Sequence, residues 1–193
     1  MKNVKLLAFA GSARKESFNK TLLHIAVQGA ESAGADVQTI DLADYPMPMF
    51  NQDLEAEQGM DPKAKEVKEM MKAADGFIIA CPEYNGSITP LLKNTIDWAS
   101  RAEEGETPLL AYRGKTALLV AASPGGFGGM RGLNPVRTIL SGIGVMVLPD
   151  QIAIPQAFEA FDGEGKLVDE KKHQAVLGLG VKLVEITEKL KDG

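Results

Sequence analysis

Five short apolar segments are spaced along the chain, and most of them are nearly continuous rather than alternating with polar residues. They span Val4 to Ala10, Asp36 to Ile40, Gly76 to Cys81, Thr116 to Ala122, and Gly144 to Leu148. A continuous apolar strand is typical of a parallel sheet that is covered on both faces. Each segment therefore predicts a buried strand.

Stretches with helical periodicity lie between these segments, and one more follows the last of them. They cover Ser17 to Ala33, Asp61 to Ala74, Thr89 to Arg101, Leu133 to Ser141, and Asp169 to Leu190. Alternating strands and helices with right-handed crossovers predict an α/β fold, with helices on both faces of a parallel sheet. Five strands suit a flavodoxin-like three-layer sandwich with strand order 2-1-3-4-5.

Length and composition narrow the class of protein. The 193 residues show no repeat and no break that would mark a linker, so one domain over residues 1–193 is expected. A net charge of −5 without a basic cluster argues against a nucleic-acid partner. The chain has a single cysteine, its first residues do not fit a signal peptide, and no apolar stretch approaches the roughly 18 residues of a membrane span. We expect a cytoplasmic protein without disulfides or a membrane partner.

The segment GSARKESFN follows the first predicted strand and leads into the first predicted helix. A helix N-terminus presents unpaired N–H groups and a partial positive charge, and hydroxyl and amide side chains can add hydrogen bonds around an anion. An arginine fork matches two phosphate oxygens. The alternative is a simple N-capping turn in which Ser17 caps the helix and Arg14 is solvated. Within the segment from Gly11 to Asn19, the candidate phosphate-binding side chains are those of Ser12, Arg14, Ser17 and Asn19.

Two further loops follow the third and fourth predicted strands. Ligands of open parallel sheets bind outside the carboxyl ends of the strands, where the strand order reverses, so these loops should neighbour GSARKESFN. PEYNGS could hold a planar ring against Tyr84, or could be an ordinary turn, since Asn-Gly is a common turn dipeptide. SPGGFGGMRG, with five glycines in ten residues, could approach a ligand closely or be a mobile surface loop.

With these three loops in order, the chain resembles the NAD(P)H-dependent FMN reductase family of flavodoxin-like proteins, over about residues 4 to 185. GSARKESFN is similar to the family's phosphate loop, and CPEYNGSITPLLKNTIDW is similar to its flavin-ring segment and the following helix. The resemblance implies that Ser12, Arg14, Ser17, the Phe18 N–H and Asn19 hold the FMN phosphate. It places Pro82, Glu83, Tyr84 and Asn85 along the isoalloxazine ring, with Ser123, Gly125 and Gly126 nearby.

The resemblance also implies the reaction. FMN itself carries hydride chemistry, so no catalytic side chain and no metal is expected. NADPH or NADH would reduce FMN at N5 and leave, and a quinone, flavin, azo compound or metal oxyanion would then be reduced at the same face. The alternative is a flavodoxin-type electron carrier without a nicotinamide site. His24 and His173 are interpreted as surface residues.

Several residues outside the three loops carry weaker expectations. Cys81 is interpreted as a buried small hydrophobe, and Ala157 to Lys166 as an exposed excursion. Tyr45 to Phe50 could cover the ring, contact a partner subunit or pack on the core. Leu91 and Trp98 should share a helix face that, in resembling proteins, helps form a dimer, so a homodimer or homotetramer is expected. Arg101 and Arg131 are candidates for binding the extra phosphate of NADPH or for subunit contacts.

Overall fold

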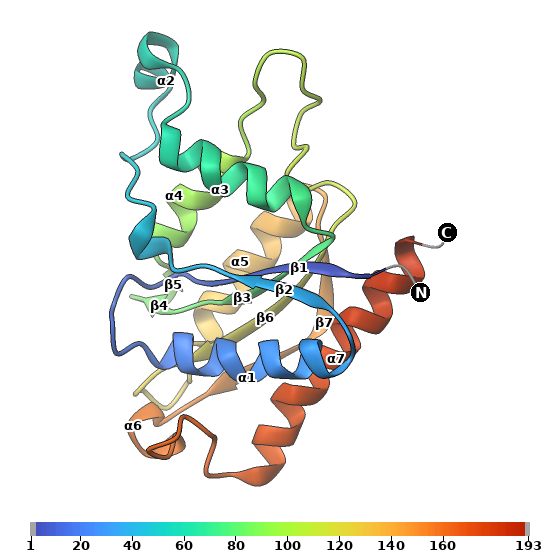
Figure 1. Cartoon of the computed structure of the whole chain (residues 1–193). Coiled ribbons are helices and arrows are strands. Elements are labelled where there is room, and N and C mark those ends of the chain that lie inside the picture. Colours follow the sequence, from blue (N-terminus) through green and yellow to red (C-terminus); the bar gives the residue numbers. More distant parts are fainter. Residues whose placement is uncertain (1–2, 192–193) are drawn as a thin grey trace.

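A five-stranded parallel sheet lies at the centre of the protein (Figure 1). The structure is a computed structural model in which residues 3–191 are described. The strands are β1 (Lys5–Ala10), β2 (Asp36–Thr39), β3 (Gly76–Ala80), β6 (Thr116–Ala122) and β7 (Met146–Ile154). Their order, β2-β1-β3-β6-β7, is 2-1-3-4-5 when these strands alone are counted. The predicted fold class and strand order are confirmed.

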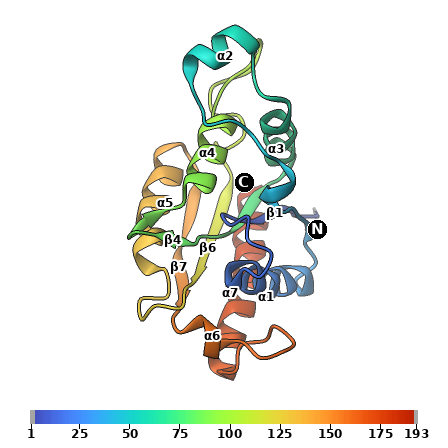
Figure 2. The same ribbon diagram turned by 90° about the vertical axis from the view of Figure 1, so that its left-hand side faces the viewer.

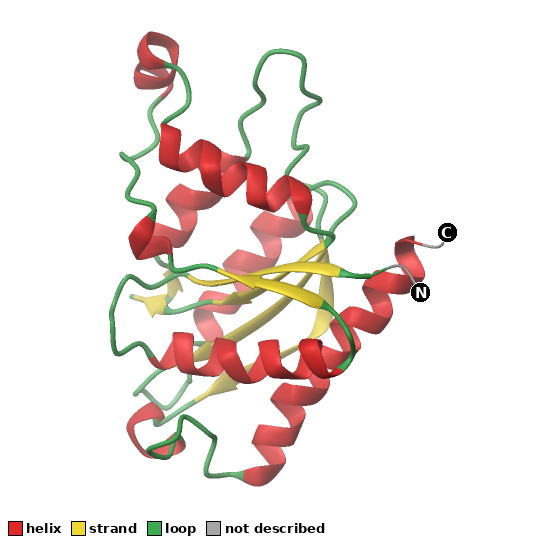
Figure 3. Cartoon of the chain, viewed as in Figure 1, coloured by secondary structure: helices red, strands yellow, loops and turns green. Residues whose placement is uncertain are grey.

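Helices cover both faces of the sheet (Figures 1 and 3). One face carries α1 (Phe18–Ser32) and α7 (Glu170–Lys191), and the other carries α3 (Pro62–Ala73), α4 (Pro90–Ala99) and α5 (Met130–Gly142). Alternate residues of a strand point to opposite faces. In β1, Leu6 and Ala8 therefore enter the core beneath α1 and α7, whereas Leu7 and Phe9 enter the core beneath the other three helices.

The edge strand β7 extends well beyond the predicted Gly144 to Leu148. It begins at Met146 and continues to Ile154, through the polar residues Asp150 and Gln151. An edge strand needs less apolar sequence than a central one, because one side of it faces solvent. The apolar run therefore marked only the beginning of the strand.

Short elements escaped the sequence prediction. These are a 3-10 turn η1 (Leu42–Asp44), helices α2 (Gln52–Gln58) and α6 (Ala157–Ala160), and a hairpin of β4 (Glu83–Tyr84) and β5 (Ser87–Ile88). Helix α2 has no buried residue, so its sequence carries no apolar stripe. It projects from the body beside the loop that follows α4 (Figures 1 and 2).

The expectation of an exposed excursion at Ala157 to Lys166 was wrong at its beginning. Ala157 is fully buried in α6, and Phe161 forms a β-bridge with Leu167 that closes the segment on itself. The apolar residues of this stretch pack against α1, which the acidic residues and glycines around them did not reveal.

The segment Tyr45 to Phe50 packs against α4. The Pro48 carbonyl accepts hydrogen bonds from Trp98 Nε1 at 2.8 Å and from Asn94 Nδ2 at 2.9 Å. The Phe50 ring meets the Trp98 indole edge to face, with centroids 5.1 Å apart. Trp98 is therefore buried within its own chain and offers no exposed face to a second subunit, contrary to the expectation for the shared face with Leu91.

Candidate phosphate and flavin site

The three loops singled out in the sequence meet at the carboxyl edge of the sheet, on the left of Figure 1. Together they line one small pocket, which we call the site pocket. Neither Gly11, Asn85, Gly125 nor Gly126 lines it, although each belongs to one of the three loops. The lining residues are Ser12, Arg14, Ser17, Phe18, Asn19, Pro82, Glu83, Tyr84, Ala122, Ser123 and Pro124.

The N-terminus of α1 opens into the site pocket. Ser17 is the N-cap residue, yet its hydroxyl makes no capping hydrogen bond, and the residue is only 5% exposed. The Phe18 and Asn19 N–H groups have no acceptor among residues 3–191, as expected for the first turn of a helix. Ser17 thus occupies the N-cap position of the simple-cap alternative, and Arg14 is exposed, but the Ser17 side chain does not make the capping hydrogen bond. The hydroxyl and the two N–H groups remain available to an anion.

Arg14 lies on the exposed side of the same loop. Within the described part of the chain, no carboxylate pairs with its guanidinium. The Ser12 hydroxyl accepts a hydrogen bond from the Arg14 backbone N–H at 3.3 Å, which fixes the bend of the loop. An unpaired arginine beside free N–H donors gives this end of the pocket a positive potential.

Asn19 has a structural task that the sequence did not suggest. Its Nδ2 donates to the Ala122 carbonyl at 2.8 Å, and its Oδ1 accepts from the Ala122 N–H at 3.0 Å. Both polar groups of the side chain therefore form hydrogen bonds with the backbone at the end of β6. These two bonds fasten the start of α1 to the central strand. The backbone N–H of Asn19 is left without an acceptor among residues 3–191.

Gly11 and Thr89 join the first loop to α4. A Cβ at Gly11 would lie 2.8 Å from the Leu92 Cβ, so only glycine fits there. The Thr89 hydroxyl donates to the Gly11 carbonyl at 2.8 Å and accepts from the Leu92 N–H at 3.3 Å. Sequence reasoning missed Thr89, although a threonine directly before Pro90 is a recognisable N-cap signal.

The PEYNGS loop is a tight hairpin. Asn85 and Gly86 both adopt positive φ, 52° and 82°, as a two-residue turn between antiparallel strands requires. The turn therefore places Asn85 at the hairpin tip, outside the pocket lining, whereas Tyr84 lines the pocket and is 52% exposed. The common-turn interpretation and the ring-support interpretation of this loop are thus compatible.

Glu83 fixes the hairpin to the glycine-rich loop. Its carboxylate accepts from Arg131 Nε at 2.7 Å and from the Arg131 N–H at 3.0 Å, and its side chain is only 7% exposed. The Arg131 guanidinium also lies 4.9 Å from the centroid of the Phe127 ring. Arg131 is therefore engaged within the site, and Arg101 is likewise paired with Glu55 at 2.9 Å.

The glycines of SPGGFGGMRG serve two purposes. Gly129 has φ of 92°, and a Cβ there would lie 2.8 Å from the Ala121 Cβ, so the fold demands glycine at this position. Gly125 and Gly126 are exposed. A Cβ at Gly125 would meet only Ser123 Oγ, at 3.8 Å, and a Cβ at Gly126 would lie in open space. The backbone of these two glycines is open to a ligand.

Cys81 lies directly beneath the site but is fully buried. Its thiol donates to the Ile79 carbonyl, and burial raises its pKa well above the usual range. A thiol that stays protonated is a poor nucleophile. This agrees with the interpretation of Cys81 as a small hydrophobe. Of the histidines, His24 is exposed and His173 is half-buried, with Nδ1 accepting from the Leu167 N–H at 3.3 Å.

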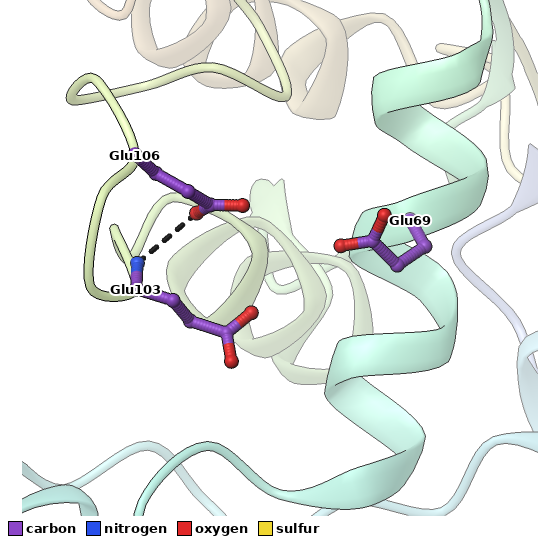
Figure 4. Close-up of side chains that lie close together, drawn as sticks. All are labelled: Glu69, Glu103 and Glu106. Atoms are coloured by element: carbon purple, nitrogen blue, oxygen red, sulfur yellow. Dashed lines mark hydrogen bonds between the residues drawn. The ribbon is translucent and has the colours of Figure 1, made fainter.

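An acidic cluster away from the site is formed by Glu69, Glu103 and Glu106 (Figure 4). Lysines of α3 compensate these charges. Lys65 pairs with Glu103 at 2.7 Å, and Lys72 pairs with Glu106 at 2.7 Å and with Glu69 at 2.8 Å. Lys68, which is 1% exposed, contacts Glu103 and Glu106. The cluster is an ion-pair network that ties the loop after α4 to α3.

A doubly wound parallel sheet, with a helix N-terminus that opens into a pocket at its topological switch point, defines a flavodoxin-like fold. None of the helices among the described residues is long and apolar enough to cross a membrane.

Comparisons with known proteins narrow this class. The profile of the family described as NADPH-dependent FMN reductase matches residues 4–159. An NAD(P)H-dependent FMN reductase of Pseudomonas aeruginosa is 34% identical over 175 residues, which cover 90% of each chain. An NAD(P)H:quinone oxidoreductase of Solanum tuberosum is 34% identical over 197 residues, which cover 97% of this chain and 95% of the other.

A solved structure agrees with these relatives. FerB, a flavoenzyme NAD(P)H:(acceptor) oxidoreductase from Paracoccus denitrificans, superimposes with a TM-score of 0.80 at 28% identity, covering 96% of this chain and 98% of FerB. The protein belongs to the NADPH-dependent FMN reductase family. It is an oxidoreductase that uses FMN together with NAD(P)H, and the resemblance inferred from its motifs is confirmed.

Proposed function

We propose that the site pocket holds FMN, and that the protein passes electrons from NAD(P)H to a small acceptor in two successive half-reactions at one site. The observation that carries this proposal is the unpartnered hydroxyl of Ser17, a residue that is only 5% exposed, next to two free helix N–H groups and the unpaired Arg14. A phosphate monoester carries about −1.5 to −2 charges near neutral pH and accepts hydrogen bonds on three oxygens. The donors present fit such a group.

The remaining lining residues support a position for the ring of the same cofactor. From the phosphate end, the lining continues to Pro82 and Tyr84 of the hairpin and to Ser123 after β6. The open backbone of Gly125 and Gly126 lies in the same loop as Ser123 and is proposed to approach the ring edge. Gly11 would act by shaping the loop, and Glu83 by holding the hairpin against Arg131, rather than by direct contact with FMN.

Bound FMN supplies the capacity to accept and return a hydride, and the protein need only bind, orient and exclude water. No histidine, lysine or cysteine among the described residues lines the site pocket, and the carboxylate of Glu83, which does line it, is bound by Arg131. We therefore propose no catalytic residue. The acceptor is proposed to be a quinone, a free flavin, an azo compound or a metal oxyanion. Quinone is favoured because the Solanum tuberosum relative is described as a quinone oxidoreductase.

Anaerobic mixing tests the nicotinamide step. Flavin-loaded protein mixed with NADPH or NADH in a stopped-flow instrument should lose its absorbance near the flavin maximum within the time of one turnover. A quinone added afterwards should restore it without further nicotinamide. Slow or absent bleaching with both nicotinamides would contradict the reductase proposal, and a stable blue semiquinone would favour the electron carrier instead.

Three broader features belong to the proposal. Residues 1–193 are taken as one FMN-binding domain, because both core clusters share one sheet. A cytoplasmic location is proposed, since NAD(P)H is supplied there and the single cysteine is a free thiol. A homodimer or homotetramer is proposed on the basis of the resemblance, and the exposed Met49 and Leu110 beside α4 and its following loop are available apolar contacts. Light scattering that showed a monomer would contradict the proposed homodimer or homotetramer.

A further inference from the structure

A second hollow adjoins the phosphate end of the site pocket. Six of the residues that line it are Arg14, Lys15, Ser17, Phe18, His24 and Phe158. It shares Arg14, Ser17 and Phe18 with the site pocket, and no residue of the hairpin or of the glycine-rich loop reaches it. Its volume is about 360 Å³, against about 90 Å³ for the site pocket, and lies in the range of small-molecule sites. The hollow is large enough for more than a single ion.

Uncompensated positive charge gathers on one wall of this hollow. Neither Arg14 nor Lys15 has a carboxylate partner among residues 3–191. Lys20, also at the wall, is paired with Asp41 at 2.5 Å, and Glu16 is the one acid present. Ser17, 5% exposed and with an unpartnered hydroxyl, lies on the boundary between the two pockets. The boundary is therefore suited to a group that carries more than one phosphate.

An exposed aromatic ring also lines this hollow. Phe158 is 75% exposed, and it is held edge to face against Phe18 with centroids 5.1 Å apart and planes at 89°. Phe18 in turn stacks on Phe161 at 6.0 Å. A ring that is fixed in place and open to solvent offers a face on which a planar heterocycle can stack at little entropic cost.

We propose that this hollow, the adenylate pocket, takes the adenylate half of a flavin dinucleotide, so that the protein binds FAD as well as FMN. The proposal rests on the proposed FMN site. An adenylate attached to the flavin phosphate would begin at the shared residues Arg14 and Ser17. Its second phosphate would face Arg14 and Lys15, and its adenine would reach Phe158.

Position favours this ligand over the adenosine end of NADPH. A nicotinamide must stack on the flavin ring, which the proposed site places at Pro82 and Tyr84. The adenylate pocket contains neither residue and lies beyond the phosphate end. With its nicotinamide on the flavin ring, NADPH would have to extend along the whole flavin tail before its adenosine reached this pocket. The adenylate of FAD, in contrast, is covalently joined to the phosphate end of the flavin.

Titration of flavin-free protein with FMN and FAD, followed by quenching of flavin fluorescence, tests the proposal. The dissociation constant of FAD should lie within about tenfold of that of FMN. The variants Phe158→Ala and Lys15→Ala should each weaken FAD by about five- to tenfold and leave FMN within about twofold, in line with one ring contact and one charged contact. Phe127→Ala is the matched control, because this exposed phenylalanine of the glycine-rich loop does not line the adenylate pocket and should not separate the two flavins.

Three outcomes would overturn the assignment. One is FAD binding more than about 100-fold weaker than FMN. Another is equal loss of FMN and FAD in Phe158→Ala. The third is binding of 2′,5′-ADP to FMN-loaded protein that Phe158→Ala weakens while FAD binding is unchanged, which would assign the pocket to NADP(H). Failure of FMN itself to bind would instead contradict the proposed function.

Discussion

Individual polar groups at the site differ in whether the fold already uses them. The Ser17 hydroxyl and the Arg14 guanidinium have no partner among the described residues, whereas both polar groups of Asn19 bind the Ala122 backbone. These residues look equivalent in the motif GSARKESFN. The structure separates the groups available to a ligand from one that builds the loop.

Replacement of Arg14 tests the phosphate assignment. Arg14→Ala should weaken FMN by about 1.5 to 3 kcal/mol, which is roughly a 10- to 150-fold rise in the dissociation constant, because a charged hydrogen bond is lost. Riboflavin, which lacks the phosphate, should bind the variant as it binds the unchanged protein. Arg113→Ala, an exposed arginine at the opposite edge of the sheet, is the control. Unchanged FMN affinity in Arg14→Ala would show that the phosphate lies elsewhere.

The thiol of Cys81 provides a second test at this scale. Because burial raises its pKa, Cys81 should react with a thiol reagent such as DTNB only after the protein unfolds. Cys81→Ser should retain most of the turnover with NAD(P)H and a quinone. Rapid labelling of native protein, or loss of turnover in a variant that remains folded, would assign the residue a redox role.

Contacts between elements hold the site in shape. Asn19 joins α1 to β6, Thr89 joins the first loop to α4, and Glu83 with Arg131 joins the hairpin to α5. Each contact links segments that are distant in sequence, so a loop alone cannot form the pocket. We therefore expect that replacing a residue that joins two elements lowers the stability of the protein, whereas replacing a residue with unpartnered polar groups weakens cofactor binding.

Asn19→Ala should destabilise the flavin-free protein. The substitution leaves the N–H and carbonyl of Ala122 without partners in a buried place, at a cost of about 1 to 3 kcal/mol. Urea unfolding, monitored by far-UV circular dichroism, measures this difference. Asn134→Ala, on the exposed side of α5, should change stability by less than about 0.5 kcal/mol. Equal midpoints for the two variants would refute the role assigned to Asn19.

The ion-pair network between α3 and the loop after α4 predicts a pH dependence. A backbone hydrogen bond from Glu103, with Lys68 and Lys72, lowers the pKa of Glu106 from 4.5 to about 2. A carboxyl whose pKa is lowered by folding stabilises the folded state above its unfolded pKa, and this contribution is lost as the pH falls. Stability should therefore decrease between about pH 4.5 and 2. In Glu106→Gln this decrease should be smaller, and an identical pH profile would contradict the assignment.

At the scale of the whole molecule, the strand order brings the functional loops together. The loops after β1 and β3 become neighbours because β1 pairs with β3, and the loop after β6 joins them because β6 pairs with β3. The sheet places all three at one edge, and the pocket forms there. The beginning of β1 and the last turn of α7 lie toward the opposite edge (Figure 1).

Much of this arrangement could be predicted from the sequence, because continuous apolar runs and helical periodicity are local properties. The central strands and the boundaries of α1 and α3 agree with their predicted ranges within a few residues. The end of β7 and helix α2 could not be predicted, since an edge strand and an exposed helix carry little apolar pattern. The hairpin at Asn85 and Gly86 had a local signal, which indicated a turn but not its strands.

The sequence by itself determined the class of fold and the family, and it singled out the loop proposed to bind phosphate, because each depends on the order of residues within short segments. Only the tertiary structure decided which polar groups of the site have no hydrogen-bond or ion-pair partner among the described residues. Asn19 binds Ala122, which is 103 residues away, and Arg131 binds Glu83, which is 48 residues away. Such pairings depend on where the packed elements bring side chains in space. The adenylate pocket arises for the same reason, since Phe158 meets Phe18 only after α6 packs against α1.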